Sequence, residues 1–314
     1  MTESVQWHAH GERGTTLALR LLRFAALRLG RRVIRPVLYP LALYFALTSR
    51  TTRRVSREYL ARVLPAPPRF RDVLRHVFSF ASISLDRVFL LTGSHPFRIE
   101  GHYGPGALET ARTRGTLLFV AHFGSFEVMR VGAVRTHELP LRIVLDVNIG
   151  RRFMAALAEL NPDIAAGIID SSRGGVDLAL RVREAVEAGA VVGIMVDRAR
   201  GGEKTVPVNF LGGTAHFPAS PWLLAAALKV PVMTVFGVWR GGDRYDAHVE
   251  ILGDEIELPR ANRDAVLRER VQDYADRLAA RVRAAPYNWL NFFDFWAPTS
   301  GRNENPGPVK SQDP

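Results

Sequence analysis

A histidine and a glutamate stand close together in the segment Ala121-His-Phe-Gly-Ser-Phe-Glu127. An imidazole beside a carboxylate can act as a general base, because the carboxylate fixes the tautomer and stabilises the imidazolium that forms. We expect His122 to take the proton of an acceptor hydroxyl as that hydroxyl attacks a thioester carbonyl, and Glu127 to orient the ring. A thioester is already activated, so no covalent acyl-enzyme is required. The pair is therefore our candidate for catalysis of acyl transfer.

The local sequence around this pair predicts a junction between a strand and a helix. The apolar run 116–121 reads as a strand that leads directly into His122. Gly124 permits a tight turn, and Ser125 can cap a helix that begins at the next residue and holds Glu127 in its first turn. The carboxyl ends of strands are where open α/β sheets bind ligands. Across such a junction the two side chains can converge, and backbone N–H groups at the new helix could stabilise an oxyanion.

Three other interpretations of the same segment stay open. His122 could be a structural histidine bonded to a nearby carbonyl, since the spacing of the pair by itself is a weak signal. Ser125 could be a nucleophile, but the sequence lacks the second small residue of a nucleophile elbow. A metal site is disfavoured because no second histidine follows at helical spacing.

Beyond residue 97, short apolar runs alternate with amphipathic helical patterns. This alternation predicts an α/β fold with a central, mostly parallel or mixed sheet that helices cover on both faces. A segment of alternating polarity after a Gly-Gly pair is expected to be an added hairpin strand. The predicted strands are 116–121, 141–145, 190–196, 232–238 and 243–251, and the predicted helices are 51–64, 70–91, 153–160, 176–188, 222–229 and 262–284.

The N-terminal region combines arginines with apolar residues. Residues 16–48 alternate arginines with leucines and aromatics, and the apolar run 33–47 within them is shorter than the ~20 residues of a membrane-spanning helix. This composition is typical of a helix that lies in the membrane interface, or of a short, imperfect span. A buried helix pair of a soluble protein is the alternative. We expect a flexible leader at 1–15, a membrane-associated helical region at 16–93, an α/β domain at 94–296 and a disordered tail at 297–314.

The overall composition narrows the classes of function. The chain has 314 residues and a formal net charge of +11, which suggests a polyanionic partner such as nucleic acid or an anionic membrane surface. The arginines are spread over amphipathic helices without a recognisable nucleic-acid-binding module, so no nucleic acid is expected. The absence of cysteine from the sequence excludes disulfides, thiolate metal sites and a cysteine nucleophile.

Several motifs, in order, resemble those of the bacterial lipid A late acyltransferases, a branch of the lysophospholipid acyltransferase superfamily. Phe119-Val-Ala-His122-Phe-Gly-Ser-Phe-Glu127 is similar to the leading motif of that family. Gly193-Ile-Met-Val-Asp197-Arg198, Val206-Pro-Val-Asn-Phe-Leu-Gly212 and Phe217-Pro218-Ala-Ser220-Pro221 resemble its later blocks. The resemblance spans about residues 15–296, and the aromatic segment 286–296 resembles a subgroup from pigment and aryl-polyene clusters.

The resemblance implies a reaction, partners and a location. His122 and Glu127 would move a fatty acyl chain from acyl carrier protein or coenzyme A to a hydroxyl of a lipid or glycolipid, as in lipid A biosynthesis. The reaction would take place at the cytoplasmic face of the inner membrane, without a metal or other cofactor. A non-catalytic member that binds lipid or acyl carrier protein is the alternative. The implied substrate-binding residues are Gly124, Ser125, Arg152, Asp197, Arg198, Gly212 and Pro218.

Two features of the resemblance are incomplete. Arg198 stands where the family usually has glutamine. The family also has an arginine further along the chain from its glutamate, for which Arg151, Arg152, Arg181 and Arg183 are the candidates. The acyl chain requires a long apolar groove, which we place under the aromatic segment 287–296; the alternatives are that this segment anchors the C-terminus on the core or forms an aromatic belt at the membrane interface.

Overall fold

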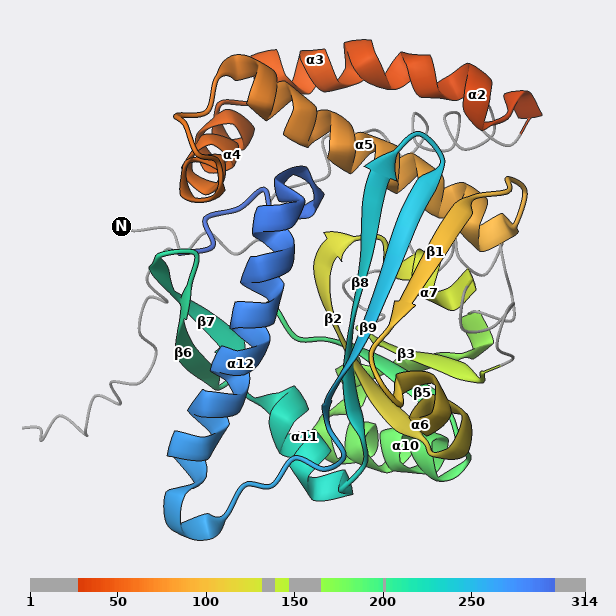
Figure 1. The fold of residues 1–314 in the computed structure, drawn as a ribbon, viewed down its shortest axis with the longest axis vertical. Coiled ribbons are helices and arrows are strands. Elements are labelled where there is room, and N and C mark those ends of the chain that lie inside the picture. Colours follow the sequence, from red (N-terminus) through yellow and green to blue (C-terminus); the bar gives the residue numbers. More distant parts are fainter. Residues whose placement is uncertain (1–27, 132–138, 147–164, 200–201, 297–314) are drawn as a thin grey trace, which may run out of the picture.

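A seven-stranded sheet forms the centre of the chain, in the order β1-β9-β8-β2-β5-β3-β4 (Figure 1). The structure is a computed structural model that describes residues 28–131, 139–146, 165–199 and 202–296. The neighbouring strands of this sheet are parallel except for the antiparallel pair β8–β9. The strands are β1 (Arg98–Tyr103), β2 (Thr116–Gly124), β3 (Leu141–Leu145), β4 (Ile168–Asp170), β5 (Val191–Met195), β8 (Val232–Gly241) and β9 (Arg244–Gly253). The mixed, mostly parallel α/β sheet predicted from the sequence is therefore confirmed.

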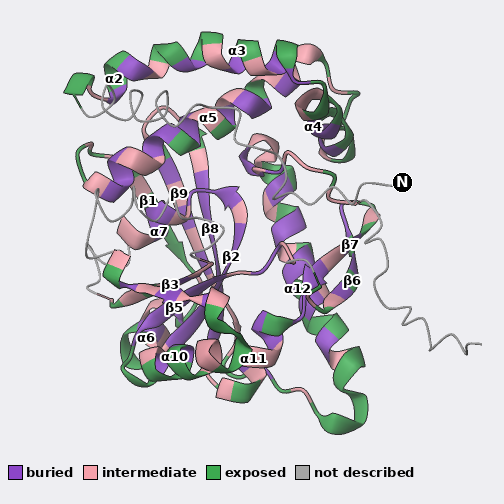
Figure 2. Cartoon of the chain, turned by 180° about the vertical axis from the view of Figure 1, so that it is seen from behind, coloured by how far each residue is buried: buried purple, intermediate pink, exposed green. Residues whose placement is uncertain are grey.

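The sheet is buried on both faces. Along β2, Leu117 and Phe119 pack in one hydrophobic cluster, while Leu118 and Val120 pack in another. Successive residues of a strand point to opposite faces, so each cluster belongs to one side of the sheet. Figure 2 shows the central strands almost entirely buried. This explains why β2 reads as a continuous apolar run and not as an alternating one.

Helices from the α/β region cover these two faces. They are α6 (Ala107–Thr113), α7 (Phe126–Arg130), α10 (Gly175–Glu187), α11 (Ser220–Leu228) and α12 (Arg263–Ala284), with short 3-10 turns η4 (Ser171–Arg173), η5 (Arg260–Asn262) and η6 (Pro286–Asn288). The helices expected at 176–188, 222–229 and 262–284 are thus confirmed within a few residues. Ser220 is the first residue of α11, and its hydroxyl donates a hydrogen bond to Glu203. The helix expected at 153–160 lies outside the described residues.

A layer of N-terminal helices lies across the top of the sheet in Figure 1. It consists of α2 (Arg31–Ile34), η2 (Arg35–Val37), α3 (Leu38–Thr48), α4 (Arg50–Val63) and α5 (Phe70–Thr92). Arg31 of α2 is fully enclosed and donates to Asp86 of α5 at 2.6 and 2.9 Å, and Asp86 also accepts from Tyr245 of β9 at 2.9 Å. This buried ion pair joins the helical layer to the sheet.

The segment from Leu29 to Leu47, which includes α2, η2 and most of α3, is apolar on its buried side and on its exposed side. Ile34, Leu38, Ala42 and Ala46 recur every four residues and are buried. The opposite side leaves large apolar side chains in solvent: Leu29, Val33, Val37, Tyr39, Leu43, Tyr44 and Leu47. Among the described residues, no helix combines the length and the hydrophobicity needed to cross a bilayer.

The aromatic segment after α12 packs on the core. Trp289 is completely buried and its ring lies 4.8 Å from the ring of Tyr59 in α4. His76 lies in α5, and its Nε2 donates a hydrogen bond to the Trp289 carbonyl at 2.8 Å. Its Nδ1 is hydrogen-bonded to the Ser56 hydroxyl, also at 2.8 Å. These contacts favour the interpretation that the segment anchors the C-terminal region on the core. They do not favour an acyl groove beneath it.

A separate two-stranded hairpin, β6 (Thr205–Phe210) and β7 (Gly213–Pro218), lies beside α12. Gly212 has a φ of +75° in the turn of this hairpin, and its neighbour Leu211 accepts a hydrogen bond from Arg62 of α4. Trp296 donates to the carbonyl of Phe210 at 3.1 Å. The hairpin therefore packs against the N-terminal layer and the aromatic segment.

Candidate active site

His122 lies at the carboxyl edge of the sheet and is held by Asp197. The ring Nδ1 is 2.9 Å from Asp197 Oδ1, and the backbone N–H of His122 donates to Asp197 Oδ2 at 3.0 Å. Asp197 has no exposed surface, whereas the His122 side chain is 33% exposed. A carboxylate can only accept, so Nδ1 carries the proton and the lone pair of Nε2 is left for an incoming group. The arrangement can therefore act as a general base.

The pairing of the strands explains why these two residues meet. Asp197 follows β5 by two residues, and β5 runs parallel to β2 as its direct neighbour. The carboxyl ends of parallel strands reach the same edge of a sheet. The ladder between β2 and β8 is irregular between Val120 and Gly124, so the backbone at His122 leaves the regular strand path. His122 thus lies within the last part of β2. The sequence had suggested a position just after the end of this strand.

Glu127 has different partners from the one expected. Its Oε2 accepts from the hydroxyl of Ser125 at 2.9 Å, and its Oε1 lies 2.6 Å from Arg87 Nε of α5. The carboxylate that contacts the imidazole is that of Asp197 and not that of Glu127. Ser125 is fully buried and engaged with Glu127, so its hydroxyl is not placed as a nucleophile. Glu127 connects the strand-helix junction to the N-terminal layer.

The junction itself depends on two glycines. Gly124 has a φ of +65°, and a Cβ built on it would lie 1.8 Å from the carbonyl oxygen of Gly237 in β8. A Cβ on Gly237 would in turn lie 2.1 Å from the carbonyl oxygen of Ser125. The Ser125 N–H donates to that same Gly237 carbonyl at 2.8 Å. Only glycine at both positions lets the two strands approach closely enough to set the turn after His122.

Arg198 joins the site to the aromatic segment. Its guanidinium donates to the Leu290 carbonyl at 2.8 Å and lies 4.8 Å from the centre of the Phe293 ring. The backbone N–H of Leu290 donates to the His122 carbonyl at 2.8 Å. The aromatic segment is thus bonded to the residue of β2 that carries the imidazole and to the residue after Asp197.

Charges around the pair set its protonation. Burial and the positive charges of Arg198 and Arg87 lower the pKa of His122, and they outweigh Asp197, which raises it. Burial raises the pKa of Asp197, but His122 and Arg198 hold it below its usual value. At neutral pH the pair therefore consists of a neutral imidazole and an ionised carboxylate, which is the state that a general base requires.

Only some of the other residues implied by the resemblance lie near His122. Gly124 and Ser125 form the junction, and Asp197 and Arg198 lie beside His122. Gly212 and Pro218 belong to the hairpin, and strand pairing does not bring them to His122. Arg151 and Arg152 lie outside the described residues. Arg181 and Arg183 pair with Asp177 and Glu187 on the surface of α10.

Arg87 is the residue at this site that the sequence did not single out. It lies in α5, 40 positions before Glu127, and it is 38% exposed beside a nearly buried carboxylate. The only available signal was the pair Asp86-Arg87 inside an otherwise apolar part of a helix. A surface pocket of about 300 Å³ lies at the opposite, amino-terminal end of the strands, around Gly115, Val186 and Pro231, away from this chemistry.

Comparison with known proteins identifies the family of the chain. A search of curated proteins gives no match for the chain. The sequence profile of the family described as "Bacterial lipid A biosynthesis acyltransferase" matches residues 12–297, which include the whole site. The chain therefore belongs to the bacterial lipid A biosynthesis acyltransferase family, and it is an acyltransferase of lipid biosynthesis.

Proposed function

We propose that the protein moves a fatty acyl chain from an acyl thioester to a hydroxyl of a lipid or glycolipid. The observation that carries this proposal is the bond of 2.9 Å between His122 and Asp197 at the carboxyl edge of the sheet. It leaves a neutral imidazole with a free lone pair on Nε2, as the reaction requires. Lipid A precursors and related glycolipids are the acceptors that the family suggests.

The reaction needs one base and no bound cofactor. His122 Nε2 takes the proton of the acceptor hydroxyl while the oxygen attacks the thioester carbonyl. The tetrahedral species then collapses with loss of the thiolate, which takes the proton back from Nε2. An ester and a free thiol are the products. Asp197 holds the imidazolium through Nδ1 in the interval, the role that our sequence interpretation had given to Glu127.

Glu127 acts in this proposal by holding the junction. Through Ser125 it fixes the turn after His122, and through Arg87 it fixes α5 over the site. The guanidinium of Arg87 is 38% exposed and close enough to lower the pKa of His122. A cation in that position would also stabilise negative charge on the thioester oxygen during attack.

The charge of the chain and its exposed surface support a proposal for the donor and for the location. Acyl carrier protein is acidic and coenzyme A carries phosphates, so both are attracted to a chain with a net charge of +11. The apolar face of α2 and α3, from Leu29 to Leu47, is followed by the exposed arginines Arg50, Arg54 and Arg57 of α4. An apolar helix face flanked by cations is typical of a helix in the interface of an anionic bilayer. We place the protein at the cytoplasmic face of the inner membrane, with an acidic carrier or coenzyme A as donor.

Mass spectrometry of the lipids of three strains tests this function. The strains carry a gene deletion, the deletion complemented by His122→Ala, and the deletion complemented by His216→Ala as a control histidine in the hairpin. We expect one lipid to lose one acyl group in the first two strains and to be restored in the third. That lipid identifies the acceptor. Identical lipid profiles in all strains would contradict the proposal, and restoration by His122→Ala would favour a binding role without catalysis.

A further inference from the structure

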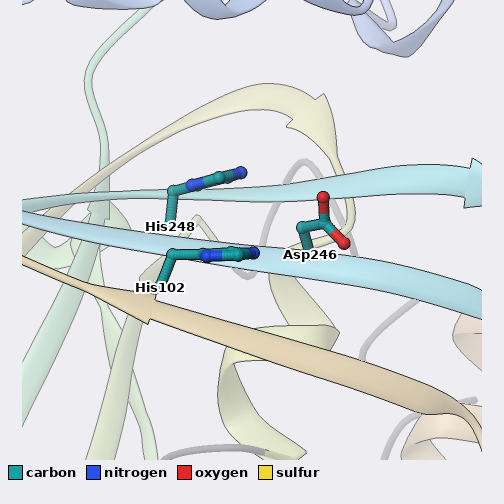
Figure 3. A group of neighbouring side chains, drawn as sticks. All are labelled: His102, Asp246 and His248. Atoms are coloured by element: carbon teal, nitrogen blue, oxygen red, sulfur yellow. The ribbon is translucent and has the colours of Figure 1, made fainter.

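Two histidines and an aspartate gather on one face of the sheet edge, away from the acyl transfer site (Figure 3). In the parallel pairing of β1 with β9, His102 lies directly opposite His248. Asp246 is two residues before His248 in β9, so its side chain projects from the same face. In the strand order of the sheet, β8 separates β9 from β2, which carries His122.

The three side chains already converge. The two imidazole rings are stacked, with centroids 4.6 Å apart and an angle of 13° between the planes. Figure 3 shows both rings extending in the same direction, towards the carboxylate of Asp246. One ligand atom of each residue lies within 4.8 Å of the others. Zinc ligands at about 2.0–2.2 Å from the metal are roughly 3.3 Å from each other in a tetrahedron, so each side chain has to move by only about 1 Å.

The ring of His248 has a nitrogen that is available to a metal ion. Its Nε2 is buried and has no hydrogen-bond partner among the described residues. Buried polar atoms are usually bonded, and a metal ion would supply a partner for this nitrogen.

Neighbouring charged side chains would compete with a metal ion for the three ligands or would favour its binding. Arg240 donates to Asp246 at 2.5 Å, and its side chain is 43% exposed, so it can turn away into solvent. Arg281 is paired with Glu250, two residues beyond His248. Glu100 lies opposite Asp246 in the strand register and 3.7 Å from His102. Two further carboxylates thus offset the arginines around the cluster.

We propose that His102, Asp246 and His248 form a site for one divalent transition-metal ion, such as Zn²⁺. Two imidazole nitrogens and one carboxylate oxygen are a donor set that suits zinc better than calcium or magnesium. Water would complete the tetrahedron. Among the strands that the structure describes, β1 lies at the edge of the sheet and pairs with β9 alone. An ion held between His102 of β1 and the two residues of β9 would fasten this edge strand to the sheet.

Calorimetric titration of the full, untagged chain with zinc chloride tests this site. The chain carries His8→Gln, His10→Gln and His122→Ala, so that the leader and the acyl transfer site do not contribute. We expect one Zn²⁺ per chain and a higher midpoint of thermal unfolding with the ion bound. His102→Gln, at a side chain that is 42% exposed, should lower the affinity by at least about tenfold. His216→Gln in the hairpin should leave it unchanged.

A variant with a higher affinity for zinc distinguishes a real metal site from the effect of a folding defect. Arg240→Ala removes the cation that competes for Asp246, so zinc should bind about two- to fivefold more tightly. No binding, or an affinity that His102→Gln does not lower, would overturn the proposal. Weaker binding in Arg240→Ala would do so as well, because it would mean that Asp246 is not a ligand.

Discussion

At the scale of the residue, the charge of His122 is governed by the groups around it. Asp197 raises its pKa, whereas burial, Arg198 and Arg87 lower it. Glu127, which the sequence pattern had suggested as the orienter, is engaged with Ser125 and Arg87. The dependence of the reaction on pH should therefore respond to Asp197 and Arg198.

Replacement of Asp197 by Asn tests which carboxylate orients the base. The imidazole has to be neutral to act, so activity falls as the pH drops through its pKa. Asp197→Asn removes a negative charge that raises this pKa, so the acidic limb of kcat/KM should move to lower pH. The rate at the plateau should fall by about 10²–10⁴-fold, because the tautomer is no longer fixed. The measurement is the pH profile of thiol release.

Two matched variants complete this test. Arg198→Gln removes a positive charge that lowers the pKa of His122, so the acidic limb should move to higher pH. Glu127→Gln should leave the limb in place. A shift caused by Glu127→Gln and not by Asp197→Asn would mean that Glu127 is the orienter after all.

His76 predicts a second effect of pH, on stability. Its ring is fully buried, and burial lowers its pKa from 6.5 to about 4. The unfolded chain takes up the proton first, so stability present above pH 6.5 is lost as the pH falls towards 4. The gap corresponds to about 3 kcal/mol of unfolding free energy. Urea unfolding of the wild type and of His76→Gln at pH 7 and pH 4.5 should show a smaller loss in the variant.

His248, whose pKa is also lowered to about 4, has to be excluded as a source of this effect. The comparison is therefore made in a chain that also carries His248→Gln. An equal loss of stability with and without His76 would show that this histidine is not held neutral in the folded state.

At the scale of the element, the site rests on the close contact between β2 and β8. The carbonyl of Gly237 accepts from Ser125 N–H and lies where a Cβ of Gly124 would be. The contact fixes the turn that separates His122 from the first helical turn of α7, where Glu127 lies. A change of one methyl group at this position should disturb the whole junction.

Substitution of Gly124 by Ala should distort the junction and destabilise the protein. The positive φ alone costs about 1 kcal/mol, and a Cβ at 1.8 Å from a backbone oxygen forces the strands apart. We expect a fall of several degrees in the midpoint of thermal unfolding, together with loss of activity. Gly175→Ala in α10, where nothing lies within 4 Å, should be neutral or stabilising. Equal midpoints for the two variants would contradict the close contact.

At the scale of the whole molecule, the sequence predicted those features of the fold that depend on local residue patterns. Hydrophobic periodicity predicted β2, β3, β5, β8 and β9 and the helices α10, α11 and α12, but not the edge strands β1 and β4 or the hairpin. The order of the motifs indicated the family. The bond between His122 and Asp197 could not be read in this way, because it depends on β5 pairing beside β2. Arg87 reaches the site from α5, so its role depends on how the N-terminal layer packs. Packing between distant segments leaves no periodic trace in a sequence.

The membrane association proposed above makes a prediction for the exposed apolar face. Leu43 and Leu47 lie on the solvent side of α3, and burying each in a bilayer is worth roughly 1.5–3 kcal/mol. The double variant Leu43→Glu with Leu47→Glu should bind anionic vesicles at least about tenfold more weakly in a flotation assay. The control is Val176→Glu with Leu180→Glu, at exposed apolar positions of α10. Equal losses in both double variants would mean that α3 is not the membrane face.

The most direct test of the account is the release of thiol from an acyl thioester by the purified protein. The assay supplies acyl carrier protein or coenzyme A thioesters together with a lipid extract as acceptor. We predict turnover by the wild type and a loss of at least about 10³-fold in His122→Ala, since both the base and its partner bond to Asp197 are removed. A His122→Ala protein that is folded and releases thiol at the wild-type rate would contradict the account.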